Sequence, residues 1–421
     1  MPRMLLAIAA LLTTTPALAQ TQIIHAGRLI VEAGRPVLGP SSITVVDGRI
    51  AAIEGGLKAV PAGAKLIDLS TKTVLPGLVD AHVHLSGDAG DDFRDEAVNP
   101  DEWGVVIGAK NAAITARAGF TTVRDLGSAS QVGFVLRRGT AAGHIPGPRI
   151  VSSGPAISII GGHGDVSGFR PEVNAALAGT NTCTGPEQCA GRVRAASKAG
   201  ADVIKITATG GVLSQQARGL GQHFTDAEMK AIVDTAHGLG LRVAAHAHGT
   251  AGVEAAARAG IDSIEHGTFT DARAIAAMKT SGTVFVPTLM AFTGIRDRLG
   301  KNVYTPVVET KVRATLEFVG RALRAARAAG VGIVFGTDAG VFEHGRNAEE
   351  FALMTSLGGL SNTEALASAT TAAAKLLDLE REIGRLAPGY SADIIAVAGD
   401  PLADIRALER VDFVMVRGRV Q

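Results

Sequence analysis

Short apolar runs and amphipathic stretches alternate through the middle of the chain. Eight apolar runs of strand length are separated by segments with helical spacing, such as residues 308–329. Several of these segments end in a glycine, as at Gly200 and Gly240, which suits a left-handed helix terminus. The apolar runs span residues 73–79, 121–124, 149–152, 202–206, 242–245, 262–265, 283–287 and 332–336. This alternation predicts an α/β fold, a parallel (β/α)8 TIM barrel.

The two ends of the chain show a different pattern. Residues 22–69 contain short alternating strands separated by turns, and residues 392–397 and 411–416 are again strand-like. We therefore expect one small β-sandwich domain built from both chain ends, residues 20–72 and 384–421. The barrel would occupy residues 73–383. A length of 421 residues accommodates this arrangement, because α/β barrels routinely exceed the usual size of one domain.

The first twenty residues have the features of an export signal. Arg3 precedes an apolar run at residues 4–12, and Ala17-Leu18-Ala19 is a small-residue cleavage site. A membrane anchor would need about 18 apolar residues, and this run is half as long. We expect residues 1–19 to be a signal peptide that is removed. The protein would then be secreted or periplasmic, with no membrane attachment.

Charge and cysteine content narrow the function classes. The chain has 41 basic and 40 acidic side chains without a basic block, which argues against a nucleic-acid partner. A hydrophobic content of 46% excludes wholesale disorder. The only two cysteines, Cys183 and Cys189, can form a disulfide in an exported protein. The alternative, a pair of zinc thiolates, lacks nearby histidines to complete four ligands.

Polar residues with metal-binding chemistry stand at the predicted strand ends, where the catalytic groups of such barrels lie. His82 and His84 follow the first run, and residues two apart in an extended segment point the same way. The corresponding residues of later runs are Lys205, His246, His266 and Asp338. Imidazole and carboxylate are suitable ligands for zinc-like ions. A lysine buried among them would lose its proton readily. We expect these groups to converge at the barrel mouth.

The pattern of H-x-H, Lys, His, His and Asp resembles that of the amidohydrolase superfamily. Residues 161–164, 210–212, 245–249 and 264–267 are similar to the imidazolonepropionase-like branch. This branch contains Xaa-Pro dipeptidases, other metallocarboxypeptidases and ochratoxin-hydrolysing amidohydrolases. The resemblance covers nearly the whole mature chain. It is specific for fold and metal chemistry and much less so for substrate.

The resemblance implies a binuclear metal centre with two divalent ions, zinc being the expected metal, bridged by N-carboxylated Lys205. His82, His84 and Asp338 would hold one ion, and His246 and His266 the other. His248 is an alternative to His246, since it lies two residues further on and can face the same way. We favour His246 because it directly ends the apolar run.

The resemblance also implies an activity. A metal-bridging hydroxide would cleave an amide or peptide bond next to a carboxylate-bearing residue, with Asp338 as ligand and catalytic base. Dipeptides and N-acyl amino acids fit this description, and ochratoxin A falls within its range. The alternative is a cyclic-amide hydrolase of the imidazolonepropionase type, whose mononuclear members need no bridging lysine. Relatives commonly form multimers, so we expect a homo-oligomer.

Loops above a barrel are where substrate contacts reside. His163 lies in a glycine-rich loop after the third strand, where the backbone can approach a ligand closely. Arg218 lies in the loop after the fourth strand, and His344 and Arg346 follow the eighth. We expect these four residues to bind substrate, the arginines by pairing with a carboxylate.

Overall fold

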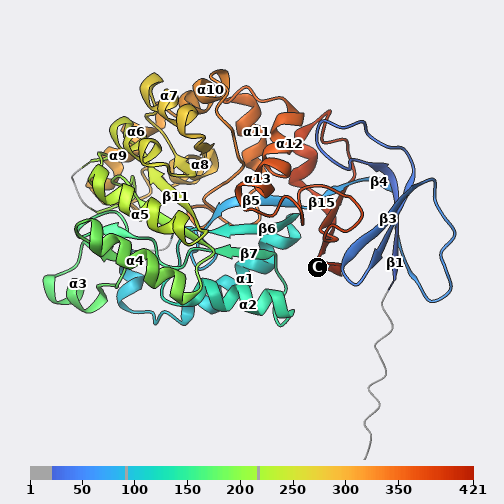
Figure 1. The fold of residues 1–421 in the computed structure, drawn as a ribbon, viewed down its shortest axis with the longest axis horizontal. Helices are drawn as coiled ribbons and strands as arrows, with labels where there is room; N and C mark the ends of the chain where they lie inside the picture. The colour runs from blue at the N-terminus through green and yellow to red at the C-terminus, as the bar shows by residue number, and fades with distance from the viewer. Residues whose placement is uncertain (1–20, 91–92, 216–218) are drawn as a thin grey trace, which may run out of the picture.

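The computed structural model describes residues 21–421 except 91–92 and 216–218 (Figure 1). The predicted signal peptide and Arg218 therefore lie outside the described residues. Within the described part of the chain, no helix is both long enough and apolar enough to cross a membrane.

Parallel strands form the wall of the barrel. One sheet contains β5 (Leu78–Val83), β6 (Phe120–Asp125) and β7 (Arg149–Ser152), and the other contains β10 (Val203–Thr207), β11 (Arg242–Ala247), β12 (Ser263–His266) and β13 (Val284–Val286). Backbone hydrogen bonds join the two sheets on one side, from Asp202 N to Ser152 O and from Ile157 N to Lys205 O.

The eighth apolar run closes the barrel without becoming a regular strand. Val334 N donates to Phe285 O of β13, and Phe335 O accepts from Ala81 N of β5. Residues 332–339 therefore form backbone hydrogen bonds with both neighbouring strands, in the place of an eighth barrel strand. This arrangement confirms the predicted (β/α)8 barrel.

Helices surround the strands on the outside (Figure 1). α5 begins with a capping box between Thr225 and Glu228, which satisfies free amides of its first turn. The helix predicted over residues 308–329 is two helices, because Gly320 adopts φ +79° between them. The bounds are α1 (Trp103–Arg117), α2 (Val132–Ala142), α3 (Pro171–Leu177), α4 (Pro186–Ala199), α5 (Asp226–Gly238), α6 (Thr250–Ala259), α7 (Ala272–Ser281), α8 (Leu289–Arg298), α9 (Pro306–Leu316), α10 (Arg321–Ala328), α11 (Glu349–Ser356), α12 (Asn362–Ser368) and α13 (Thr371–Leu376).

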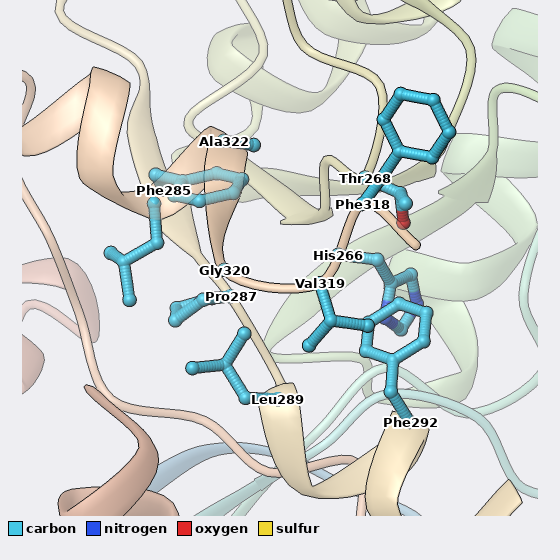
Figure 2. A pocket seen from close by; sticks show the side chains of 11 residues that line it. His266, Thr268, Phe285, Pro287, Leu289, Phe292, Phe318, Val319, Gly320 and Ala322 are labelled. Atoms are coloured by element: carbon cyan, nitrogen blue, oxygen red, sulfur yellow. The ribbon is translucent and has the colours of Figure 1, made fainter. Parts of the chain in front are cut away.

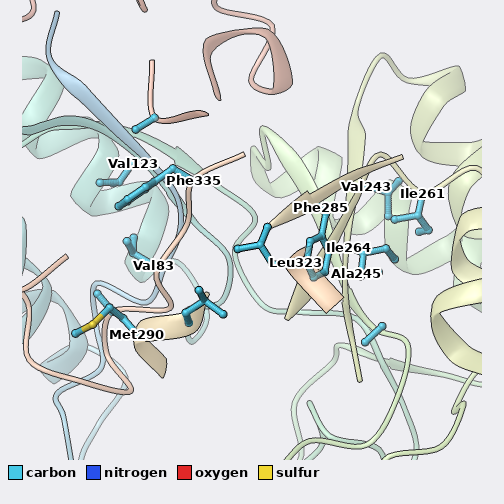
Figure 3. Close-up of a cluster of buried hydrophobic side chains, with 14 of the residues drawn as sticks. Val83, Val123, Val243, Ala245, Ile261, Ile264, Phe285, Met290, Leu323 and Phe335 are labelled. Carbon is cyan, nitrogen blue, oxygen red and sulfur yellow. The ribbon is translucent and has the colours of Figure 1, made fainter. Parts of the chain in front are cut away.

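The main core lies between these strands and helices (Figure 3). Val243 and Ile264 come from neighbouring strands, and Phe285 and Leu323 add side chains from β13 and α10. All four are almost fully buried. Burial of apolar surface on this scale is the main favourable contribution to folding. It holds the strands side by side, so that their carboxyl ends meet at one edge.

The strands from the two chain ends form a single sheet in the order β16-β15-β14-β4-β1-β2-β3. Its elements are β1 (Gln22–Leu29), β2 (Ser41–Val46), β3 (Arg49–Gly55), β4 (Lys65–Pro76), β14 (Ile394–Val397), β15 (Val411–Val416) and β16 (Arg419–Val420). The sheet bends around one apolar core. Ile50 N donates to Tyr390 O and Ala392 N to Gly48 O, which closes one side. The predicted β-rich domain from both chain ends is thus built on one continuous sheet.

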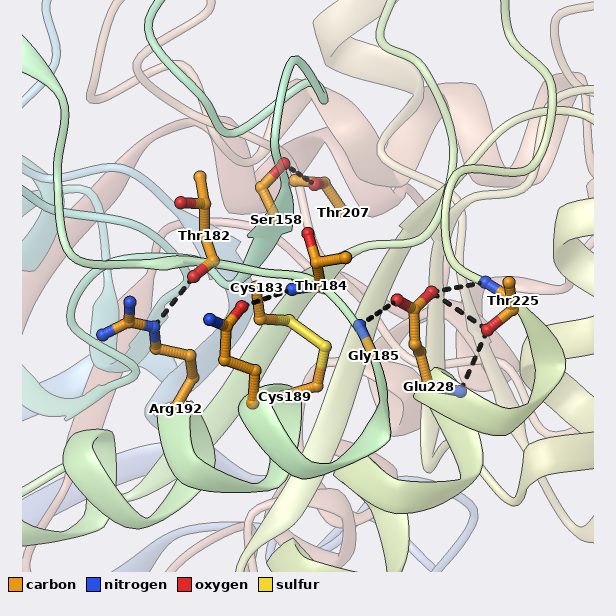
Figure 4. The surroundings of a disulfide bond; sticks show 11 residues. Ser158, Thr182, Cys183, Thr184, Gly185, Cys189, Arg192, Thr207, Thr225 and Glu228 are labelled. Carbon is orange, nitrogen blue, oxygen red and sulfur yellow. Dashed lines mark hydrogen bonds between the residues drawn. A yellow bond between two sulfur atoms is a disulfide. The ribbon is translucent and has the colours of Figure 1, made fainter. Parts of the chain in front are cut away.

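A disulfide bond joins Cys183 in β9 (Thr182–Cys183) to Cys189 in α4 (Figure 4). β9 pairs with β8 (Ser158–Ile159). On the other side of the turn, Gly185 N donates to a carboxylate oxygen of Glu228 in α5 at 2.7 Å. The bond therefore fixes a segment that packs against the loop carrying His163.

Candidate metal centre

Two groups of possible ligands lie at the carboxyl ends of the barrel strands. His82, His84 and Asp338 form one group, and His246, His248 and His266 form the other. Within each group the ligand atoms lie within 4.8 Å of one another. The structure thus brings together all the residues that the sequence predicts as metal ligands, with His248 beside them.

Hydrogen bonds fix the orientation of the first group. His82 Nδ1 lies 2.9 Å from Glu265 Oε2, and His84 Nδ1 lies 3.0 Å from Gly127 O. A carboxylate and a carbonyl can only accept hydrogen bonds, so each Nδ1 carries the proton. Each Nε2 faces Asp338 Oδ1, at 3.4 Å and 3.2 Å. Burial lowers the pKa of His84, but its hydrogen bond to Asp338 outweighs this and raises the pKa above its usual value. A metal ion bound between the two imidazoles and the carboxylate would take the place of that proton.

These separations suit a zinc-like ion. Nitrogen and oxygen ligands about 2.0–2.1 Å from a tetrahedral ion lie about 3.3 Å from each other. The two distances from Asp338 Oδ1 to the imidazoles bracket this value. The donor set and its spacing therefore fit a divalent ion held by His82, His84 and Asp338.

The second group is prepared in a similar way. His266 Nδ1 lies 2.7 Å from the Thr288 hydroxyl, which donates its own proton to Pro287 O. That hydroxyl therefore accepts from His266, whose Nε2 is left with a lone pair. His248 Nδ1 bonds the Thr268 hydroxyl at 2.8 Å. Burial lowers the pKa of His266 well below its usual value and that of His248 to about 3, so both imidazoles are neutral, as ligands must be.

Lys205 lies between the two groups. It comes from β10, points into the barrel and is 4% exposed, and its Nζ lies 3.4 Å from His82 Nε2. Burial lowers the pKa of this ammonium group to about 8. The lysine therefore exchanges its proton far more readily than a surface lysine would.

Asp338 is held in place by its backbone. Its φ is +64°, in the left-handed region, and its amide donates to His82 O at 2.7 Å. Asp80 supports this turn, because its carboxylate accepts from both the amide and the hydroxyl of Thr337. Burial raises the pKa of the Asp338 carboxyl, but the nearby imidazoles of His82 and His84 outweigh this and hold it well below its usual value.

A cavity of about 900 Å³ opens over both groups. His163 lines it, with Nδ1 2.6 Å from the Ser214 hydroxyl. Its ring packs so closely on Gly211 that a Cβ there would lie 2.3 Å from it. Apolar side chains also line the cavity, namely Val212, Leu213, Ala291, Phe292, Ile295 and Val341. The space suffices for a dipeptide-sized ligand above the candidate ions.

A second hollow lies behind His266, among Phe285, Pro287, Leu289 and Phe318 (Figure 2). Its volume of about 10 Å³ is at most that of one water molecule. This hollow is a small gap in the apolar packing around His266 and is too small to hold a substrate.

The fold uses two of the predicted substrate residues elsewhere. His344 bonds the Thr115 hydroxyl through Nδ1 and the carbonyl of His84 through Nε2. Arg346 pairs with Glu343 and Glu349. Neither side chain lines the cavity. We therefore do not expect either side chain to contact substrate.

The sequence interpretation missed the groups that orient the ligands. Glu265 bonds His82 from a different strand, and Thr288 bonds His266 across 22 residues of sequence. Glu265 stands directly before His266, and the left-handed backbone of His266, at φ +69°, lets both side chains reach His82. An acidic residue directly before a predicted ligand, inside an apolar run, was the available signal.

A barrel with histidines, a buried lysine and an aspartate at its strand ends defines a class of (β/α)8 enzymes with a candidate metal centre. The amidohydrolase family pattern matches residues 73–420. The chain belongs to the amidohydrolase family and is a hydrolase of carbon–nitrogen bonds.

Relatives and solved structures agree with this assignment. Ochratoxinase of Aspergillus niger is 32% identical over 358 residues, which cover 80% of this chain and 72% of that protein. The structure of a Xaa-Pro dipeptidase with bound methionine has a TM-score of 0.87 at 37% identity and covers 96% of this chain and all of its own. A prolidase complexed with N-methylphosphonate-L-proline has a TM-score of 0.87 at 30% identity, covering 96% and 99%. The predicted superfamily and branch are confirmed.

Proposed function

We propose that the protein is a binuclear metal-dependent amidohydrolase that releases a C-terminal amino acid from dipeptides or N-acyl amino acids. One observation carries the proposal: two groups of ligands converge on the buried Lys205 at the floor of a cavity. The relatives support the substrate class, since ochratoxinase, a Xaa-Pro dipeptidase and a prolidase are among the similar proteins. Ochratoxin A, an amide of phenylalanine, falls within this class.

In this proposal His82, His84 and Asp338 would hold one ion, His246 and His266 would hold the other, and Lys205, carboxylated on its amine, would be a ligand of both. The two ions, most simply zinc, would activate water and polarise the scissile carbonyl. Carboxylation requires the neutral amine, and the lowered pKa of Lys205 makes that form available near neutral pH. The presence of this lysine favours the binuclear enzyme over a mononuclear cyclic-amide hydrolase.

The chain's own residues would handle protons and orientation. Asp338 Oδ1 accepts a proton from the attacking water and passes it to the departing nitrogen. Its carboxylate is ionised, as a base must be, because the surrounding imidazoles lower its pKa. His163 and His248 line the cavity beside the ligands and would contact the substrate.

A release assay tests the proposal. The panel contains dipeptides, N-acyl amino acids and matched compounds in which the terminal carboxylate is replaced by hydrogen, each with and without a chelator such as 1,10-phenanthroline. We expect amino acid release from the carboxylate-bearing substrates, loss of release with chelator, and recovery after Zn²⁺ is restored. Chelator-insensitive release would contradict the metal centre. Equal hydrolysis of the compounds without a carboxylate would contradict the substrate class.

A further inference from the structure

A chain of buried polar contacts continues from His82 into the barrel interior. Glu265 Oε2 accepts from His82 Nδ1 at 2.9 Å, and Glu265 Oε1 accepts from Arg124 Nη2 at 3.0 Å. The hydroxyl of Ser263 donates to the same oxygen. The side chains of Arg124 and Glu265 are 1% and 0% exposed. A guanidinium and a carboxylate thus lie in the interior directly below a candidate ligand.

The arrangement is rigid. Arg124 Nε donates to Ala81 O at 2.6 Å and Nη1 to the Ser263 hydroxyl at 3.1 Å, so contacts from two strands fix the guanidinium. Fully buried ion pairs add little to stability compared with apolar packing, because both charges lose their hydration. The ion pair between Arg124 and Glu265 is therefore not explained by a gain in folding stability. Its contact with His82 indicates a role at the candidate metal centre.

We propose that Glu265, held in position by Arg124 and Ser263, is a positioning residue for the ion that His82, His84 and Asp338 would bind. It keeps the proton of His82 on Nδ1, aims Nε2 at Asp338 and makes the imidazole a stronger donor. Partners of this kind change metal affinity about 10–100-fold.

The effect is specific to one of the two ions. The ligands proposed for the second ion have neutral partners instead: His266 contacts the Thr288 hydroxyl, and His246 contacts the carbonyl of Gly210. Loss of the Glu265 charge should therefore weaken the binding of the first ion and leave the affinity for the second ion unchanged. This inference rests on the proposed function, which supplies the metal centre.

The experiment titrates Zn²⁺ into metal-stripped full-length protein in competition with a chromogenic chelator. Glu265→Gln keeps the shape and an acceptor oxygen but removes the charge. We expect the wild type to bind two ions, and the variant to bind one of them about 10–100-fold more weakly. Arg149→Gln serves as the matched control, because Arg149 pairs with the buried Asp393 outside the cavity. It should bind both ions as the wild type does.

A double variant guards against misfolding, since Glu265→Gln leaves Arg124 buried without its counter-charge. Glu265→Gln with Arg124→Gln removes both charges together. We expect it to fold, to show the same loss of affinity, and to have a changed Co²⁺ absorption spectrum. A folded double variant that binds two ions as tightly as the wild type would overturn the inference alone. A wild type that binds no ion would overturn both this inference and the proposed function.

Discussion

Asp338 joins two roles on one side chain. Its Oδ1 lies within 3.4 Å of the Nε2 atoms of His82 and His84, and its backbone is fixed in a left-handed conformation. Its position beside the two imidazoles allows the carboxylate to bind a metal ion, and its negative charge allows it to accept a proton. An amide of the same shape would retain an oxygen for the ion but could not accept the proton.

We predict that Asp338→Asn lowers kcat by at least about 10²-fold, since proton transfer by a positioned side chain contributes about 10²–10⁴-fold. Steady-state kinetics with a cleaved dipeptide, together with metal analysis, measure the effect. Asp393→Asn is the matched control, because Asp393 is a buried carboxylate paired with Arg149 away from the cavity. Full turnover by Asp338→Asn at unchanged metal content would show that the assigned role is wrong.

His246 and His248 can be separated by substitution. The His246 ring lies 4.7 Å from that of His266 and 4.3 Å from that of His163, while His248 stacks on His266 at 5.0 Å. We predict that His246→Asn loses one of two bound ions, whereas His248→Asn keeps both and raises KM. Metal analysis and kinetics of the two variants check this. The reverse pattern would make His248 the ligand.

Among the helices and strands, the sequence pattern predicted which residues stand at the strand ends. It did not predict which side chains hydrogen-bond to them. The H-x-H pair and Lys205 occupy strands whose inward direction follows from alternation. The carboxylate that orients His82 comes from β12, and only the barrel's closure brings these strands together. His344 illustrates the same limit, since its loop turns it toward Thr115 of α1 instead of the cavity.

A buried carboxyl group also anchors α8, which lines the cavity. Glu350 is fully buried and accepts hydrogen bonds from Leu289 N at 2.9 Å and Met290 N at 2.6 Å, at the first turn of that helix. Burial raises the pKa of this carboxyl to about 8, compared with about 4.3 in an unfolded chain. Because the folded state holds the proton more tightly, this contribution to stability is complete below about pH 4.3 and is lost as pH rises through about 8.

We predict that Glu350→Gln, which cannot ionise, removes this part of the pH dependence. Between pH 5 and about 9, the free energy of unfolding of the metal-free wild type should fall relative to that of the variant. Denaturant unfolding at a series of pH values measures both. Parallel curves over this range would show that Glu350 does not titrate as described.

At the scale of the whole molecule, one sheet ties the chain ends to the barrel. β4 pairs with β1 and β14 and runs to Pro76, two residues before β5 begins. Arg149 of β7 reaches Asp393 of the small domain. The alternation of strands was sufficient to predict a domain from both ends. Its continuity as a single sheet depends on long-range pairing that local patterns do not specify.

We predict that residues 1–19 direct export and are then removed, so that the mature protein begins at Gln20. Expression of the full chain in a Gram-negative host, followed by N-terminal sequencing of the periplasmic fraction, checks the cleavage site. Ala19→Pro should leave an uncleaved precursor, because the small residue before the cut is lost. A mature protein that retains residues 1–19 would contradict the signal peptide.

In the proposed centre, Lys205 and the neighbouring histidines and aspartate bind two cations inside one barrel. An anomalous difference map from a crystal of zinc-loaded protein, recorded at the zinc edge, tests it most directly. We expect two peaks, one bound by His82, His84 and Asp338 and the other by His246 and His266, with a carbamate on Lys205 between them. A single peak, or an unmodified Lys205 that bridges nothing, would contradict it.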